Sequence, residues 1–209
     1  MRLVCFAVKE EANAFRKLAG EAVEVLLTGI GRRNAGKAMH AALAAHKPDL
    51  VISSGFAGGL RPDLKLGDIV FSADGESSLG PALLAGGAKP VKFHCVEKIV
   101  TSAAEKRGLW RQTGADAVEM ESETICGVCR EQSIPVAIVR VILDTADEDL
   151  PLDFNQLLDA DQRMDAGKLA WTLARSPAKI SALLRLQKKS AAAAEKLARV
   201  LSDVLGRRE

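Results

Sequence analysis

Two hydrophobic periodicities alternate along the first 145 residues of the chain. Short apolar runs, typical of buried strands, predict strands near residues 2–8, 22–28, 49–54, 67–72, 91–100, 115–120 and 135–143. Helical spacing predicts helices near 9–19, 32–46, 102–113 and 122–132, with two more after residue 153. The stretch 75–90, rich in Gly, Ser and Ala, is expected to be the least ordered. This alternation indicates an α/β fold with helices on both faces of a mostly parallel sheet.

Two of the predicted strands run into carboxylates. Residues 117–122 read Ala-Val-Glu-Met-Glu-Ser, and residues 140–147 read Arg-Val-Ile-Leu-Asp-Thr-Ala-Asp. Because a helix is predicted between them, we expect neighbouring parallel strands of one βαβ unit. Glu121 and Asp144 would then meet in one crevice at the carboxyl ends of the strands. Acids that converge at such a place are more often chemical than structural.

The same two segments resemble signature segments of the purine nucleoside phosphorylase and methylthioadenosine/adenosylhomocysteine nucleosidase superfamily. Three more segments match in the right order, after the first, second and third strands: Val8–Ala12, Thr28–Ala35 and Ile52–Gly59. Within the superfamily the chain is most similar to the hopanoid-associated phosphorylases, through its short length and four segments: Ser72–Gly75, Val96–Thr101, Leu173–Pro177 and Ile180–Leu186. The resemblance implies a three-layer αβα fold with a mixed, mostly parallel sheet. We expect one domain over residues 1–209, with a catalytic core over 1–150 and a C-terminal helical extension over 151–209.

The resemblance implies cleavage of the N-glycosidic bond of a purine nucleoside, with release of adenine. Asp144 matches the acid that protonates the departing purine, for which burial would have to raise its pKa. Glu121 matches the carboxylate that binds the ribose hydroxyls. Met120 would pack on the ribose face or, as an equal alternative, fill the core. The resemblance places the lining of the base at Ala57, Gly58, Ile99, Val118 and Glu119.

The attacking group is open between water and phosphate. Glu11 matches the base that activates water in the nucleosidases. Phosphate would need N–H, hydroxyl and cationic groups, and the matching positions are Thr28, Gly29, Gly31, Arg32, Arg33, Ser54, Gly55 and Phe56. The chain departs from both patterns: Ser53 and Ser54 stand where phosphorylases usually have an arginine, and Phe56 stands where nucleosidases usually have a small residue. No metal or cofactor is expected, apart from phosphate as a co-substrate.

An apolar side chain at Phe56 and a short segment between residues 70 and 100 suit a nucleoside with a large apolar 5′ group. The resemblance implies adenosylhopane, a lipid-linked nucleoside of hopanoid biosynthesis. Residues 177–209 carry eight cations and three anions, a net charge of +5 on a chain whose net charge is +2. A basic amphipathic helix there would lie on an anionic membrane surface. The alternative, favoured by the break in the apolar stripe at Ser190–Ala194, is a helix packed on its own domain.

Composition agrees with a folded cytoplasmic protein, with peripheral membrane association as the alternative. The chain has 209 residues, of which 48% are hydrophobic and 27% charged, which argues against disorder. Its apolar start runs directly into Lys9 and Glu10, which indicates a first strand rather than a signal peptide. The basic C-terminal segment has no aromatic residues, which argues against a nucleic-acid partner. The resemblance implies a homo-oligomer.

Two other classes of protein are weighed against the enzyme. A non-catalytic nucleoside-binding protein would not need Glu11, Glu121 and Asp144 together. A dithiol redox protein would use Cys126 and Cys129, which have the right spacing. However, this pair falls inside a predicted helix, whereas a redox thiolate is expected at an exposed helix N-terminus.

Overall fold

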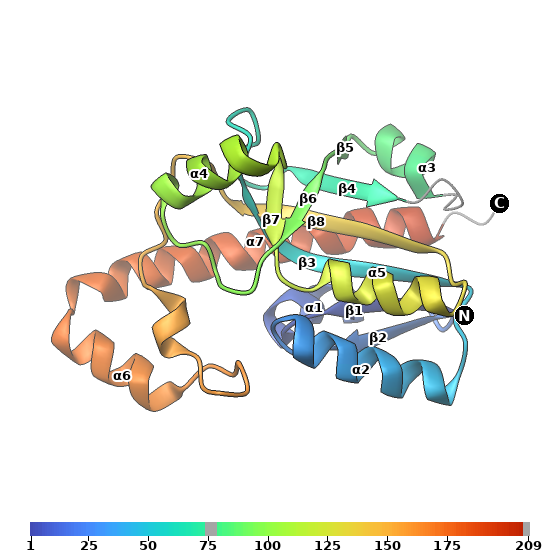
Figure 1. Cartoon of the computed structure of the whole chain (residues 1–209), viewed down its shortest axis with the longest axis horizontal. Helices are drawn as coiled ribbons and strands as arrows, with labels where there is room; N and C mark the ends of the chain where they lie inside the picture. Colours follow the sequence, from blue (N-terminus) through green and yellow to red (C-terminus); the bar gives the residue numbers. More distant parts are fainter. Residues whose placement is uncertain (74–78, 207–209) are drawn as a thin grey trace.

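A twisted sheet runs through the computed structural model, which describes residues 1–73 and 79–206 (Figure 1). The strands are β1 (Arg2–Phe6), β2 (Val23–Leu27), β3 (Leu50–Gly59), β4 (Ile69–Ala73), β5 (Lys89–Pro90), β6 (Phe93–Cys95), β7 (Ala117–Glu119) and β8 (Val136–Asp144). The helices are α1 (Lys9–Arg16), α2 (Arg32–Ala45), α3 (Leu79–Ala85), α4 (Ala103–Thr113), α5 (Ser122–Glu131), the 3₁₀ helix η1 (Phe154–Leu157), α6 (Ala166–Arg175) and α7 (Ala178–Gly206).

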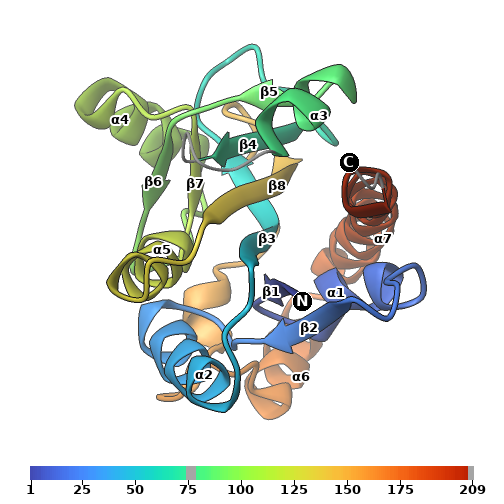
Figure 2. The same cartoon turned by 90° about the vertical axis from the view of Figure 1, so that its right-hand side faces the viewer.

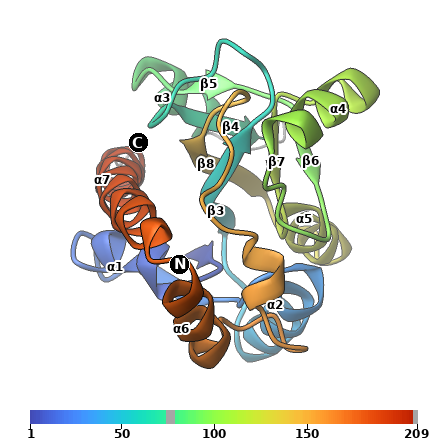
Figure 3. The same ribbon diagram turned by 90° about the vertical axis from the view of Figure 1, so that its left-hand side faces the viewer.

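The main path of the sheet has the strand order β2-β1-β3-β8-β4-β5. Strands β2, β1, β3 and β8 are parallel, whereas β4 is antiparallel to β8. Helices α1 and α7 cover one face, and α2 and α5 cover the other (Figures 2 and 3). The predicted three-layer α/β fold with a mixed, mostly parallel sheet is therefore confirmed.

Central strands are buried on both faces, which explains their nearly continuous apolar sequences. In β1, residues Leu3 to Phe6 are at most 1% exposed. Phe6 packs with Phe15 of α1 and Leu197 of α7, whereas Leu3 packs with Met39 of α2 on the opposite face. Because successive side chains of a strand point to opposite faces of the sheet, β1 contributes side chains to two separate cores.

The expected pairing of the strands that end in Glu121 and Asp144 is wrong. Strand β3 lies between them: β8 pairs with β3 over most of its length, whereas β7 pairs antiparallel with Gly58 and Gly59 at its end. The glycine-rich run expected to follow the third strand is itself strand, because β3 continues to Gly59. The absence of side chains at its end allows this crowding, since a Cβ on Gly58 would lie 3.1 Å from a Val118 methyl carbon and 3.3 Å from Asp144 Oδ2.

The region between β4 and α4 also differs from expectation. Instead of one strand over residues 91–100, that range holds only the short strand β6 and an irregular segment after it, and the short strand β5 ends just before it. The stretch expected to be least ordered contains helix α3. Residues Asp74 and Gly75, part of a segment that pointed to the hopanoid-associated subfamily, lie outside the described residues. The other predicted helices and strands form within a few residues of their predicted bounds, except for β3.

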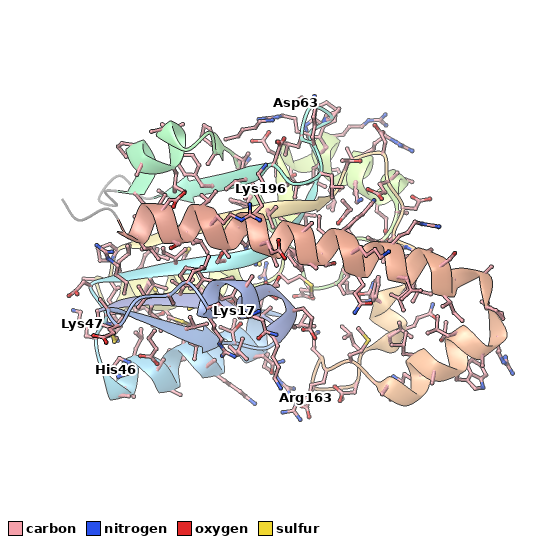
Figure 4. All side chains as sticks on the ribbon, turned by 180° about the vertical axis from the view of Figure 1, so that it is seen from behind. Lys17, His46, Lys47, Asp63, Arg163 and Lys196 are labelled. Atoms are coloured by element: carbon pink, nitrogen blue, oxygen red, sulfur yellow. The ribbon has the colours of Figure 1, made fainter. Side chains whose placement is uncertain are left out.

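The two halves of α7 have different surroundings. Its C-terminal half packs on the sheet through Ala193, Leu197 and Leu201, and Lys196 lies on its exposed side (Figure 4). The first turns of α7 extend with α6 beyond the end of the sheet, and α6 buries none of its residues (Figure 1). The alternative prediction, a helix packed on its own domain with a solvated basic face, describes the C-terminal half. Among the described residues, no helix is both long and apolar enough to cross a membrane.

Candidate active site

A buried arginine gathers three carboxylates from other elements. Arg140 of β8 is 1% exposed, and its Nη2 donates to Glu119 Oε2 at 2.7 Å. The same nitrogen lies 3.5 Å from Glu121 Oε2. Glu11 of α1 contributes the third carboxylate, and both it and Arg140 lie against Gly55. We call Arg140, Glu11, Glu119 and Glu121 the Arg140 cluster; with all three acids ionised it would carry two more negative than positive charges.

Glu11 is held by backbone N–H groups of the segment before α1 and of strand β3. Its Oε2 accepts from the N–H groups of Ala7 (3.0 Å) and Val8 (3.3 Å), and its Oε1 accepts from Phe56 N–H at 2.8 Å. The first two bonds cap the N-terminus of α1 in the way a glutamate at the third helical position often does. The third bond ties the carboxylate to β3. Burial raises the pKa of Glu11 above its ordinary value, although Arg140 and these three hydrogen bonds act in the opposite direction.

Glu11 and Arg140 both approach Gly55 closely, and its lack of a side chain is required there. A Cβ at this position would lie 2.5 Å from Glu11 Oε1 and 2.8 Å from Arg140 Nη1. The backbone of Gly55 also has φ near +136°, a conformation that other residues rarely adopt. Any side chain at this position would therefore push the base predicted to activate water out of place.

Glu121 stands at the start of α5 and reaches the start of α2. Its Oε1 accepts from Gly31 N–H at 2.9 Å, and its residue is 6% exposed. Burial raises the pKa of Glu121 to about 7; the Arg140 guanidinium opposes this rise and the Glu119 carboxylate adds to it. Near neutral pH this side chain therefore exists in both its proton-donating and its proton-accepting form, and either form can bind a hydroxyl group.

Glu119 has a different environment, in which its charge is fully paired. It accepts from Arg140, from the N–H groups of Glu121 (2.9 Å) and Ser122 (2.8 Å), and from Ser122 Oγ at 2.6 Å. Burial alone would raise its pKa, but Arg140 and the hydrogen bonds from Ser122 lower it below the ordinary value. With its acceptor positions used in this way, Glu119 has the geometry of an anchor for Arg140 and α5. Its predicted role in lining the base remains a prediction.

Asp144, the predicted acid, lies at the end of β8 and is 7% exposed. Its Oδ2 forms an ion pair with the ammonium of Lys106, a residue of α4 with 0% exposure. Burial raises the pKa of Asp144 above its ordinary value, whereas Lys106 acts to lower it. A carboxyl group tuned in this way suits an acid that must hold a proton and then release it.

Asp144 and Glu11 each lie beside a glycine of strand β3. Gly58 faces Asp144, and Gly55, three residues earlier on β3, faces Glu11. Three residues of a strand span roughly 10 Å. A ligand as long as a nucleoside, lying along β3, could therefore contact both acids.

The two arginines assigned to a phosphate are engaged elsewhere. Arg32 Nη2 donates to Cys95 O at 2.8 Å and to Glu123 Oε2 at 2.6 Å. Arg33 Nη2 donates to Asp161 Oδ1 at 2.7 Å, in an exposed pair. Neither guanidinium therefore supplies its charge to the Arg140 cluster in this structure.

The hydroxyl groups assigned to the same site are also bonded to the backbone. Thr28 Oγ1 lies 3.0 Å from Gly29 O, and Ser54 Oγ donates to Val139 O at 2.9 Å. Gly29 and Gly31 both have positive φ and shape the turn before α2, but the N–H of Gly31 is used by Glu121. Phe56 contributes its N–H to Glu11, while its half-buried ring packs against the core.

Residues predicted to line the base fall into two places. Gly58 pairs with Val118 across β3 and β7, beside Asp144, and the neighbouring residues Ala57 and Met120 are 4% and 8% exposed. Ile99 lies on the irregular segment before α4, where both its N–H and its carbonyl oxygen bond the carboxamide of Asn155 at 2.8 Å.

Cys126 and Cys129 lie inside α5, as predicted. They are 6% and 0% exposed and pack in the core on the α2 and α5 face of the sheet. A buried helix interior lacks the exposure that a cycling thiolate requires. Within residues 1–73 and 79–206, no group of three His, Cys, Asp or Glu side chains is arranged to hold a metal ion.

Two residues that organise the site received no role from the sequence. Arg140 begins one of the recognised segments, and a charge within a strand predicted to be buried was the available signal. Lys106 lies on the same buried face of α4 as Ala103. The sequence shows Lys106 three residues after Ala103, on the same side of the predicted helix. However, an isolated lysine on a helix is ordinarily expected to face solvent.

Comparisons with known proteins agree with this fold. A family profile described as the phosphorylase superfamily matches residues 6–80 and 87–175. A 5′-methylthioadenosine/S-adenosylhomocysteine nucleosidase of Actinobacillus succinogenes is 31% identical over 172 residues, which cover 66% of this chain and 75% of the relative. The corresponding nucleosidase of Shewanella pealeana is 29% identical over 178 residues, 68% of this chain and 76% of the relative.

A solved structure shows the same fold at low identity. It is a putative 5′-methylthioadenosine/S-adenosylhomocysteine nucleosidase of Borrelia burgdorferi bound to adenine, which is 16% identical to this chain, with a TM-score of 0.73 and 99% of each chain covered. The match of the family profile extends from β1 to the end of α6 and includes every residue of the Arg140 cluster and Asp144. The chain belongs to the phosphorylase superfamily, and the predicted superfamily and enzyme class are confirmed.

Proposed function

We propose that this enzyme hydrolyses the N-glycosidic bond of a purine nucleoside and releases adenine. The observation that carries the proposal is the placement of Glu11, a buried carboxylate held by three backbone N–H groups. It lies beside Arg140 at Gly55 of β3, and Asp144 lies beside Gly58 of the same strand. The curated relatives named above are nucleosidases for methylthioadenosine and adenosylhomocysteine, which supports the same reaction.

Each acid has one role in the proposed reaction. Glu11 takes a proton from a water molecule as the water oxygen bonds to the anomeric carbon of the ribose. The electron pair of the breaking C–N bond moves to the purine, which takes a proton from Asp144. Glu121 binds the ribose hydroxyls, with Met120 against the sugar. Solvent then removes the proton from Glu11 and returns one to Asp144, so the net reaction consumes one water.

Water suits this site better than phosphate. Three glutamates surround Arg140, and a phosphate dianion placed beside Glu11 would be repelled by these carboxylates. Arg32 and Arg33, which would have to neutralise it, are held by Glu123 and Asp161. Phosphorolysis therefore requires both arginines to leave their partners, whereas hydrolysis uses the groups as they stand.

The choice of nucleophile can be measured directly. We expect adenine release from methylthioadenosine in phosphate-free buffer, with free sugar as the product and no increase when phosphate is added. Glu11→Gln, which keeps the shape and removes the base, is expected to lower kcat by about 10²-fold or more. The neighbouring exposed residue serves as the control, since Glu10→Gln leaves the Arg140 cluster untouched. Phosphate-dependent release of a sugar 1-phosphate would instead establish a phosphorylase.

We propose adenosylhopane, the lipid-linked nucleoside implied by the subfamily resemblance, as the finer choice of substrate. Phe56 supports it by placing an aromatic ring next to the backbone N–H that holds Glu11. The ring is half-buried and packed on the core, so it presents an apolar edge rather than a hydroxyl group. Against such an apolar side chain, the binding of the substrate becomes more favourable with each methylene of the 5′ substituent that is buried.

A series of 5′-alkylthio adenosines tests this preference. If the 5′ group is buried against apolar side chains, kcat/KM should rise with chain length. At the limit of full burial, each added methylene stabilises the bound transition state by about 0.8 kcal/mol. Phe56→Ser should flatten the series while leaving turnover of methylthioadenosine in place, which makes the short substrate the internal control. An enzyme that turns over methylthioadenosine well and adenosylhopane not at all would reject the lipid-linked substrate.

Contact with a membrane and assembly into a homo-oligomer remain predictions. Large apolar side chains are exposed on α6 and the first turns of α7: Trp171 is 59% exposed, Leu184 53% and Ile180 43%. The guanidinium of Arg175 stacks over the Trp171 ring at 3.7 Å. This surface has both the apolar and the basic groups that an anionic membrane binds. It also has enough exposed apolar side chain to contact a second copy of the chain.

A further inference from the structure

A buried ammonium group lies beside the predicted acid. Lys106 Nζ forms an ion pair with Asp144 Oδ2 and donates to the carbonyl oxygens of Thr145 at 2.8 Å and Glu148 at 2.6 Å. Two of the three N–H donors of this ammonium thus bond carbonyl oxygens, and the Asp144 carboxylate supplies a counter-charge. The charged form of Lys106 is therefore stabilised, although its side chain is 0% exposed.

A structural role alone is a poor explanation for this lysine. A buried charge is expensive to desolvate, and an apolar side chain of similar volume usually stabilises a fold at least as well. The same buried face of α4 carries Ala103, which needs no partner. The lysine is instead placed where its charge acts on one carboxylate.

Other charges around Asp144 come from two more elements. Glu148 lies on the loop after β8, and Lys189 comes from α7; these two side chains form an ion pair with each other. The charge of Lys189 is therefore largely balanced by Glu148, and Lys106 is left as the cation that acts on Asp144 directly. The next pair, Arg107 with Asp147, is 3.6 Å apart with its side chains 48% and 79% exposed.

We propose that Lys106 is a positioning residue for the reaction, which holds Asp144 in place and stabilises the carboxylate that Asp144 becomes after giving its proton to the purine. This inference rests on the proposed function. In the step itself, the O–H bond of Asp144 breaks, a bond forms between that proton and the purine nitrogen, and the electron pair of the C–N bond goes to the purine. The negative charge left on Asp144 then faces the ammonium of Lys106. Lys106 transfers no proton in this step and keeps its positive charge.

The pH dependence of the rate follows from this arrangement. Burial raises the pKa of Asp144, so that the acid keeps its proton, and Lys106 lowers the same pKa, so that the acid can release it. A general acid loses activity as pH rises through its pKa. Removal of Lys106 raises the pKa of Asp144, and the alkaline limb of the profile must move to higher pH. The rate on the plateau must fall, because the carboxylate formed in the step has lost its counter-charge.

Lys106→Met tests the proposal, with Arg107→Met as the matched control on the same helix. We expect the alkaline limb of kcat/KM for adenine release to move up by about one pH unit or more, and kcat to fall by about tenfold or more. Arg107→Met removes a cation that does not contact Asp144, and should change neither quantity. A fall in kcat with the alkaline limb unmoved would show a merely structural role and overturn the proposal.

A second measurement does not depend on how Lys106→Met folds. In the wild-type protein the ¹⁵N chemical shift of the Lys106 side chain, followed by nuclear magnetic resonance, should respond when Asp144 titrates, and Asp144→Asn should abolish this response. A Lys106 chemical shift with the same pH response in the wild type and in Asp144→Asn would contradict the proposed pair. If the wild type released adenine from no purine nucleoside, the proposed function would fail, while this measurement would still decide the coupling of the two groups.

Discussion

Asp144→Asn is expected to lower kcat for adenine release by about 10²–10⁴-fold, the range that general acid catalysis usually supplies. Asparagine has nearly the same shape, and its amide oxygen still accepts a hydrogen bond from Lys106. It has no proton acidic enough to transfer to the purine nitrogen. The purine would then have to leave as an anion, and the lost rate measures what protonation contributes.

Asp147→Asn provides the control for this experiment. It removes the same charge three residues later, at a side chain that is 79% exposed and 3.6 Å from Arg107. Exposed ion pairs of this kind contribute little to stability, so neither folding nor rate should change measurably. A single-turnover assay with both variants, together with thermal unfolding, separates chemistry from stability. A well-folded Asp144→Asn protein with wild-type kcat would rule out Asp144 as the acid.

Arg140→Met is expected to lower the free energy of unfolding by about 3–5 kcal/mol, the usual result of removing one partner from a buried ion pair. Arg140 is 1% exposed, and Glu119 would keep its other hydrogen bonds but lose its counter-charge. Glu11 and Glu121 would lose the one cation that opposes the effect of burial. Urea unfolding measures the loss, and Arg33→Met is the control, because its pair with Asp161 is exposed.

The destabilisation by Arg140→Met should depend on pH with a definite sign. In the wild type, the pKa of Glu121 is raised to about 7, above its value in an unfolded chain. Such a group contributes stability below its unfolded pKa and loses it as pH rises through the folded value. Without Arg140 the folded pKa rises further, so the loss should be larger at pH 8 than at pH 5. An equal loss at both pH values would mean that the carboxylates of the Arg140 cluster do not interact through Arg140.

The order of strands and helices was readable because it depends on local pattern. Continuous apolar runs indicated the central strands, and their burial on both faces explains why. The pairing of β7 with β8 was predicted wrongly because pairing depends on which backbones meet in space. The glycines at the end of β3 allow that strand to continue between the two, and a local pattern of apolar residues does not report this.

The acids were found from the sequence, but their electrostatic partners were not. Glu121 and Asp144 became candidates because they follow predicted strands, and Glu11 became one through the resemblance to the nucleosidases. Arg140 and Lys106 are 1% and 0% exposed, in contrast to most charged residues, which face solvent. Their burial is a property of the packed sheet and of α4, since it requires carboxylates and carbonyl groups from distant parts of the chain.

The sequence by itself therefore determined the α/β fold, the order of most of its elements and the superfamily, and it proposed the three acids of the candidate site. Those features depend on the local hydrophobic pattern and on short segments that can be identified without knowing their tertiary contacts. The tertiary structure alone decided which strands pair, which carboxylates share Arg140, and that Lys106 faces Asp144. Each of these is set by contacts between residues that are far apart along the chain, and the pKa of a buried acid depends on such contacts more than on its own identity.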